Sequence, residues 1–124
     1  MLARRFLRHS VIYILIGIGI GIHMAASHKY TLAAAHAHLN LLGFVSMAIY
    51  GLFYRVYPSA TNDRLANWHF WIANIGVVGL IGALIPYLLG VKEAEPFTAA
   101  FSFVVLAGMI LFAIIVFRAT AKEG

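Results

Sequence analysis

The chain has 124 residues, of which 63% are hydrophobic and 10% are charged, and its mean hydropathy is +0.91. So apolar a composition in so short a chain excludes an ordinary water-soluble domain and predicts one integral membrane domain. The lack of cysteine excludes disulfides, thiolate-bound metal and iron–sulfur clusters, and the net charge of +5 is explained by membrane topology without a nucleic-acid partner.

Four apolar segments predict four membrane-spanning helices, at about residues 9–26, 32–54, 65–90 and 97–118. Because the linkers are short, neighbouring helices should run antiparallel and form an all-α, up-and-down four-helix bundle over residues 1–124. The first segment is similar to a signal peptide, with a basic start and an Ala-Ala-Ser ending. We expect it to be retained, because its loss would leave three spans.

Arginine and lysine are distributed unevenly between the two sides of this bundle. Lys29 and Lys92 fall on one side, and seven basic residues fall on the other: Arg4, Arg5, Arg8, Arg55, Arg64, Arg118 and Lys122. By the positive-inside rule, this asymmetry predicts that both termini are cytoplasmic.

Local signals predict where the helices begin and end. Thr31 is expected to cap the second helix and Asp63 the third. Pro96 stands where the first turn of the fourth helix should begin, a favoured place for proline. Pro86 lies inside the third segment and should kink its outer end.

His36 and His38 form the most informative pair in the chain, because both lie inside the apolar second segment. An imidazole is costly in hydrocarbon unless it binds something or lines a wet cavity. Two residues apart on a regular helix, the two side chains point about 200° apart, so they cannot easily chelate one small ion. A haem suits them better, because it needs one or two axial nitrogens, an apolar slot and a polar exit for its propionates.

The other histidines divide by their depth in the membrane. His23 and His28 should share the outer slab with the pair, so that His23 is the best sixth ligand from the same chain. His28 is expected to be a solvated loop residue that could meet haem propionates. His9 should lie at the inner surface, and His69, flanked by tryptophans, should lie in the aromatic belt at the inner end of its helix.

Small residues recur in the predicted spans. Gly17 and Gly21 form a small-xxx-small pair, and we interpret such residues as sites of ordinary close helix packing. Ala73, Gly76 and Ala83 line much of one face of the third helix. Gly43 follows His36 by two turns on the same face, which makes it the best candidate for a flat wall against which a planar ring can lie.

Two stretches of the sequence carry a family pattern. His28, Ala35, His36 and His38 give a loop histidine followed by Ala-His-x-His, in a helix that ends in Tyr-Gly-Leu-Phe-Tyr at 50–54. A short inner loop then leads to Trp-His-Phe-Trp-Ile-Ala-Asn-Ile-Gly, ending at residue 76. In order and spacing, this resembles the tenth and eleventh transmembrane helices of subunit I of the haem-copper oxidases. The Leu-Leu-Gly run at 41–43 is closer to the nitric-oxide-reductase and cbb3-type branches of that family.

The resemblance implies roles for three histidines. His36 would bind the high-spin haem, His38 the low-spin haem, and His28 would lie near propionates and a bound metal. The sequence departs from the family in lacking the His-Pro-Glu-Val-Tyr run, the adjacent His-His pair and the helix that supplies the second low-spin ligand. The resemblance therefore implies haem retention in a bacterial inner membrane, without oxygen or nitric oxide reduction by one subunit.

The family arranges twelve helices as three arcs of four, which bears on the oligomer. A homotrimer of this chain would rebuild twelve helices, and a homodimer would place two copies of the second helix near each other. We therefore predict a homo-oligomeric protein that binds haem b (iron protoporphyrin IX) through His38 or His36. The sixth ligand would be His23 or a histidine of a neighbouring subunit, and the function would be electron transfer with a redox partner, or binding of a diatomic gas.

Two other functions stay open at this point. A copper site at the outer surface could use His23, Met24, His28 and His36. A structural or assembly subunit of a respiratory complex would need no cofactor at all. A stand-alone enzyme is not expected, because the spans contain no Asp or Glu to act as general acid or base, and any catalysis would belong to a haem iron.

Overall fold

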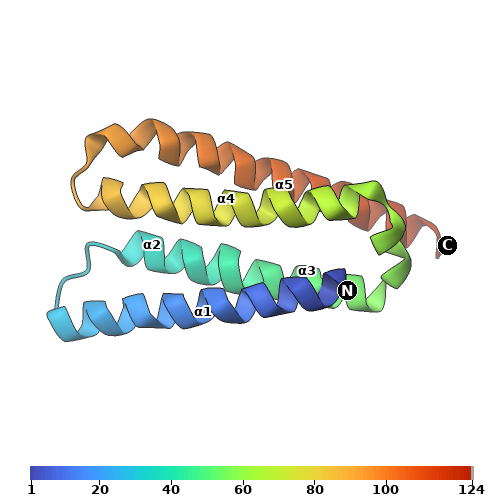
Figure 1. The fold of residues 1–124 in the computed structure, drawn as a ribbon, viewed down its shortest axis with the longest axis horizontal. Coiled ribbons are helices and arrows are strands. Elements are labelled where there is room, and N and C mark those ends of the chain that lie inside the picture. The colour runs from blue at the N-terminus through green and yellow to red at the C-terminus, as the bar shows by residue number, and fades with distance from the viewer. Residues whose placement is uncertain (124) are drawn as a thin grey trace.

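The computed structural model describes residues 1–123, which fold into four long antiparallel helices joined by short turns (Figure 1). In chain order the elements are α1 (Leu2–Ser27), α2 (Ala33–His38), the π-helix η1 (Leu39–Ser46), α3 (Met47–Val56), the 3₁₀ helix η2 (Pro58–Asn62), α4 (Arg64–Leu88), the 3₁₀ helix η3 (Lys92–Ala94) and α5 (Glu95–Ala121). The segments α2, η1 and α3 run on continuously and make the second long helix. All four are long and apolar enough to cross a membrane, and the chain is a multi-pass membrane protein.

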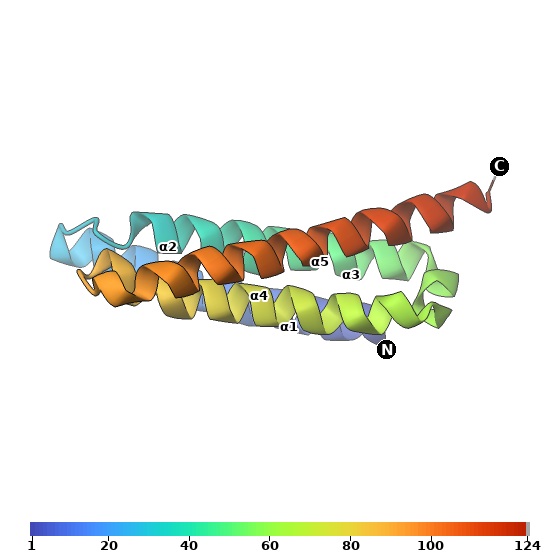
Figure 2. The ribbon, with the colours of Figure 1, turned by 90° about the horizontal axis from the view of Figure 1, so that it is seen from above.

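The helices are arranged as two hairpins that pack side by side. In Figure 1, α1 lies beside the second helix and α4 lies beside α5, and Figure 2 shows the same layers from above. Both chain ends and η2 lie at one end of the bundle, and the other two turns lie at the opposite end. Six of the seven basic residues of the sequence asymmetry belong to helices that begin or finish at the end with the termini, and the seventh, Lys122, directly follows α5.

The first helix begins at Leu2, earlier than the sequence predicts. Ala3 and Phe6 are buried, and the Phe6 ring lies 5.5 Å from that of Tyr50 and 5.1 Å from that of Phe70. The hydropathy of the segment marks the part that can cross the membrane, whereas packing against α3 and α4 keeps the basic first turns helical as well.

The predicted caps have mixed outcomes. Asp63 caps α4, since its Oδ1 accepts a hydrogen bond from the Leu65 amide at 2.9 Å. Pro96 lies in the first turn of α5, also as predicted. The prediction for Thr31 is wrong: the N-cap position is Leu32, whose carbonyl accepts the His36 amide, and no side chain caps α2. Pro86 lies in the last turn of α4.

The second helix departs from regular α geometry in its middle. Residues 39–46 form the π-helix η1, in which each turn holds an extra residue, and Ser46 Oγ donates a hydrogen bond to the Leu41 carbonyl at 3.0 Å. The π-helix starts directly after His38 and includes Asn40 and Gly43. It rotates α3 about the helix axis relative to α2, which carries the two histidines.

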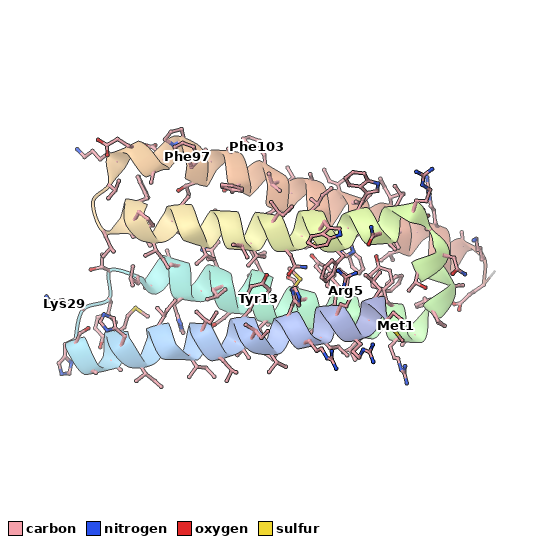
Figure 3. The ribbon with its side chains drawn as sticks, viewed as in Figure 1. Met1, Arg5, Tyr13, Lys29, Phe97 and Phe103 are labelled. Atoms are coloured by element: carbon pink, nitrogen blue, oxygen red, sulfur yellow. The ribbon has the colours of Figure 1, made fainter. Side chains whose placement is uncertain are left out.

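The core is concentrated at the end that holds the termini. An aromatic cluster fills it, with ring centroids of neighbouring members 4.5–5.9 Å apart: Phe6, Tyr50, Tyr54, His69, Phe70 and Phe112. In contrast, α5 has few buried residues, and Phe97 and Phe103 point away from the other helices (Figure 3). Most of α5 therefore faces the surroundings of the chain.

Candidate functional site

His36 points inward, onto α1. Its Nδ1 lies 2.7 Å from the carbonyl oxygen of Gly17, and its Cε1 lies 2.9 Å from where a Cβ at Gly21 would be. The glycine pair therefore provides the space in which this imidazole packs between the first two helices. The interpretation of Gly17 and Gly21 as packing residues is supported, and the imidazole is what they pack against.

Asn40 completes the environment of this ring. Because a carbonyl oxygen only accepts hydrogen bonds, His36 Nδ1 carries the proton and donates it in a hydrogen bond to the Gly17 carbonyl. Nε2 is then unprotonated and can accept a hydrogen bond. The Asn40 side-chain amide faces that Nε2 at 3.4 Å. Asn40 Oδ1 is buried without a hydrogen-bond partner among residues 1–123, and a Cβ at Gly17 would collide with it. His36 is thus enclosed by protein on both ring nitrogens.

His38 points the opposite way and is exposed. Its Nδ1 lies 2.7 Å from the Ala34 carbonyl, one turn earlier on its own helix. That contact fixes the proton on Nδ1 and leaves Nε2 as the free lone pair, which has no protein partner among the described residues. After His38, toward the end of the bundle that holds the termini, the second long helix carries an exposed apolar stripe of Leu41, Val45, Ile49 and Leu52. The divergence predicted for the His-x-His pair is what the structure has.

His23 and His28 lie at the same end of the bundle as the pair, but the structure does not gather the four histidines. His23 is exposed on α1, about 200° around the helix from Gly21, so it points away from the face that His36 contacts. His28 is exposed and ends α1 with a left-handed φ of 56°. Within residues 1–123, no three His, Asp or Glu side chains come close enough to hold a metal ion, so the three histidines of the copper alternative are not assembled.

Gly43 does not present an open wall. A Cβ there would lie 2.8 Å from Tyr13 Cβ and 3.1 Å from Leu39 Cδ1, so the Tyr13 side chain already covers this surface. Gly43 is buried and serves close packing of η1 on α1. The expectation that a planar ring lies against it is therefore not supported by this packing.

His69 lies near the start of α4, but its side chain is fully buried in the aromatic cluster instead of facing outward like the neighbouring tryptophans. Tyr54 Oη lies 2.9 Å from its Nδ1, and its Nε2 has no partner among residues 1–123. Trp68 and Trp71 are exposed while His69 faces inward. The signal was in the spacing, since His69 lies on the helix face of small residues that continues through Ala73 and Gly76.

A polar network that the sequence did not predict joins α1 to α4. Asn74 Oδ1 accepts hydrogen bonds from His9 Nδ1 and from the Tyr13 hydroxyl, both at 2.7 Å, and Asn74 Nδ2 donates to the Phe70 carbonyl. His9 is half-buried in this network rather than free at the inner surface. These contacts hold the two hairpins together near the aromatic cluster.

Comparison with known proteins assigns the sequence to a family. Residues 20–92, more than half of the chain, match the family described as cytochrome c and quinol oxidase polypeptide I. The chain belongs to this family. The match includes His28, His36, His38 and all of α4, the residues on which the resemblance to haem-copper oxidase subunit I rests.

Individual oxidase subunits also match part of the chain. A cytochrome c oxidase subunit 1 homolog (bacteroid) of Bradyrhizobium diazoefficiens is 36% identical over an alignment of 64 residues that covers 47% of this chain and 12% of that protein. A homolog of Agrobacterium tumefaciens is 32% identical over 74 residues, and cytochrome c oxidase subunit 1 of Rhodobacter capsulatus is 30% identical over 73. The chain thus spans only 12–13% of the length of these relatives. No solved structure gives a significant match.

The two histidines differ in how well they fit the haem of this oxidase family. His38 offers the arrangement typical of an axial ligand: Nδ1 anchored to a backbone carbonyl, Nε2 free, and an apolar surface beside it. His36 does not fit in the same way, because Gly17, Gly21 and Asn40 surround its ring. A haem ligated by His38 would lie on the outside of the bundle.

Proposed function

We propose that this chain is a b-type haem protein of a bacterial inner membrane, with His38 as an axial ligand of the iron. The observation that carries the proposal is the His38 ring itself, whose Nδ1 contacts the Ala34 carbonyl at 2.7 Å while Nε2 faces outward. Its position in a segment matched to the oxidase subunit I family supports haem over other ligands.

The hydrogen bond to Ala34 has a chemical consequence for ligation. A carbonyl that accepts a hydrogen bond from Nδ1 fixes the tautomer, keeps the ring oriented and raises the basicity of Nε2. A bound haem would supply one-electron redox chemistry. His38 would position it along the stripe formed by Leu41, Val45, Ile49 and Leu52, which excludes water from one face of the ring.

The second axial nitrogen would come from His38 of another copy of this chain. The apolar stripe below His38 is exposed in a single chain, and a two-fold axis beside it would bring two such stripes and two His38 rings together. This homodimer would enclose the ring between matching surfaces and make the iron six-coordinate, which favours electron transfer over binding of a gas.

The basic residues support an orientation for this site. With the termini cytoplasmic, His38 lies in the outer half of the membrane, close to the loop that carries His28 and Lys29. Both loop residues are exposed there and could meet the haem propionates. The chain has no cysteine to which a vinyl group could be attached, which excludes a covalently held c-type haem and is compatible with the proposed haem b.

The absorption spectrum of the purified chain tests this function. We expect reduced protein to show the bands of a six-coordinate b-type haem that carbon monoxide does not shift. His38→Ala should lose the bands, whereas His23→Ala, which removes an exposed histidine from the same end, should keep them. A colourless wild-type protein expressed with adequate haem supply would remove the proposal, and a carbon monoxide shift would move the function to gas binding at an open iron.

His36→Ala separates the two histidines. Because the His36 side chain packs from α2 onto α1, its loss should lower the stability of the first hairpin and leave the haem bands in place. Loss of haem in His36→Ala together with retention in His38→Ala would reverse the assignment.

A further inference from the structure

The termini end of the bundle carries a groove that the haem proposal does not use. It lies between α1 and the last turns of α3, has a volume of about 820 Å³, and is lined chiefly by Arg4, Arg8 and Arg55 together with Leu7, Val11 and Ile12. We call these six residues the basic groove. The positive-inside rule explains why basic residues are at this end, but it does not explain why three of them line one apolar groove.

Packing of the two helices creates this convergence. Gly51 lies against α1 so closely that a Cβ there would be 2.7 Å from Leu7 Cγ and 3.0 Å from the Ala3 carbonyl. Arg55 follows Gly51 by one turn on the same face of α3, and Arg4 and Arg8 are one turn apart on α1. The close approach at Gly51 therefore brings arginine side chains from two helices into the lining of the same groove.

The three guanidinium groups are not neutralised by the protein. The one ion pair among residues 1–123 joins Arg118 to Asp63, on other elements, and the hydrogen bond found for Arg4 goes to the weak acceptor Met1 Sδ. Arg5 behaves differently, since its guanidinium carbon lies 4.0 Å from the centre of the Phe70 ring of α4. Arg4, Arg8 and Arg55 are all exposed, and they give the groove a rim of unpaired positive charge.

We propose that the basic groove binds an acidic phospholipid. The phosphodiester headgroup would be held by the three guanidinium groups, and one acyl chain would lie along Leu7, Val11 and Ile12, which continue from the rim into the membrane-spanning part of α1. Charge complementarity selects the headgroup, and the apolar floor selects a lipid over a free anion. The lipid is a structural ligand that fixes the junction of α1 and α3 in the cytoplasmic leaflet.

Native mass spectrometry of the full chain in neutral detergent can measure this binding. We expect dioleoylphosphatidylglycerol to be retained in preference to dioleoylphosphatidylcholine, which has the same chains without net charge. Since each guanidinium near a membrane surface contributes about fivefold in affinity for an acidic lipid, Arg4→Gln alone should cost about fivefold. The triple variant Arg4→Gln, Arg8→Gln, Arg55→Gln should cost about a hundredfold.

The control is Arg64→Gln, which removes an exposed arginine at the same end but outside the groove and should leave retention unchanged. Circular dichroism checks that each variant keeps its helices, and the single variant keeps the test valid if the triple one misfolds. Equal retention of the two lipids, equal loss in Arg64→Gln, or displacement of the lipid by inorganic phosphate as effectively as by phosphatidylglycerol would each overturn the proposal.

Discussion

At the residue scale, one short motif places two imidazoles in opposite environments. The two-residue step predicts that His36 and His38 diverge, and the structure confirms it, with one ring against α1 and the other exposed. Hydropathy alone could not tell which of them faces inward, because lipid and a neighbouring helix are equally apolar. The glycines of α1 held that information, since only there can a backbone approach the ring.

Gly17→Ala tests the enclosure of His36. The added methyl would collide with Asn40 Oδ1, and we expect the free energy of unfolding to fall by about 1–3 kcal/mol. Gly19→Ala is the matched control, because nothing lies within 4 Å of its Cβ position, and it should be neutral or stabilising by up to about 1 kcal/mol. Denaturation in mixed micelles measures both, and equal effects of the two substitutions would contradict the described packing.

Asn74→Ala tests the network between the hairpins. It leaves His9 Nδ1 and the Tyr13 hydroxyl without their acceptor, which should cost about 1–3 kcal/mol of stability. Asn67→Ala, an exposed asparagine on the same helix, should change stability by less than about 0.5 kcal/mol. If the two variants unfold at the same denaturant concentration, the network does not hold the hairpins together.

At the scale of elements, composition predicts the spans but not their internal geometry. The four apolar segments, the Asp63 cap and Pro96 in the first turn of α5 follow from local chemistry. The π-helix at residues 39–46 does not, because its extra residue per turn depends on how Asn40 and Gly43 pack on α1. Nor does the early start of α1, since the burial of Phe6 depends on partners far along the chain.

Asp63 gives α4 a pH-dependent start. The Leu65 amide, and after it Arg118, lower the pKa of its carboxyl below the usual 3.8. A lowered pKa means that the stabilisation is present above the unfolded-state pKa and is lost as the pH falls through the folded-state pKa. Asp63→Ala should therefore cost about 1 kcal/mol at neutral pH, and its difference from wild type should shrink below about pH 4.

Asp63→Asn is the control for this cap, because asparagine keeps the accepting oxygen without the charge. It should be nearly as stable as wild type at neutral pH and should show a weaker acid dependence. Unfolding curves across this pH range measure the effect. A deficit of Asp63→Ala that stays constant down to pH 2 would assign the stabilisation to something other than the carboxylate.

At the scale of the whole molecule, membership of the oxidase subunit I family could be predicted from order and spacing over two helices. The packing of a single chain could not be predicted in this way: His69 is buried in the core, Gly43 is covered by Tyr13, and of the pair His36 and His38 only His38 is exposed. In the proposed function, His38 would ligate haem beside a stripe of exposed apolar residues, so a second copy of the chain would complete the site. The proposal therefore depends most on the number of chains per haem.

The most direct test of the proposed site is the ratio of haem to chain in the purified oligomer. Quantitative amino-acid analysis measures the chain, and the pyridine adduct of the extracted haem measures the haem. Two His38 rings on one iron require one haem for every two chains, with none retained in His38→Ala. A wild-type oligomer without haem, or one that keeps its haem when His38 is replaced, would contradict the account.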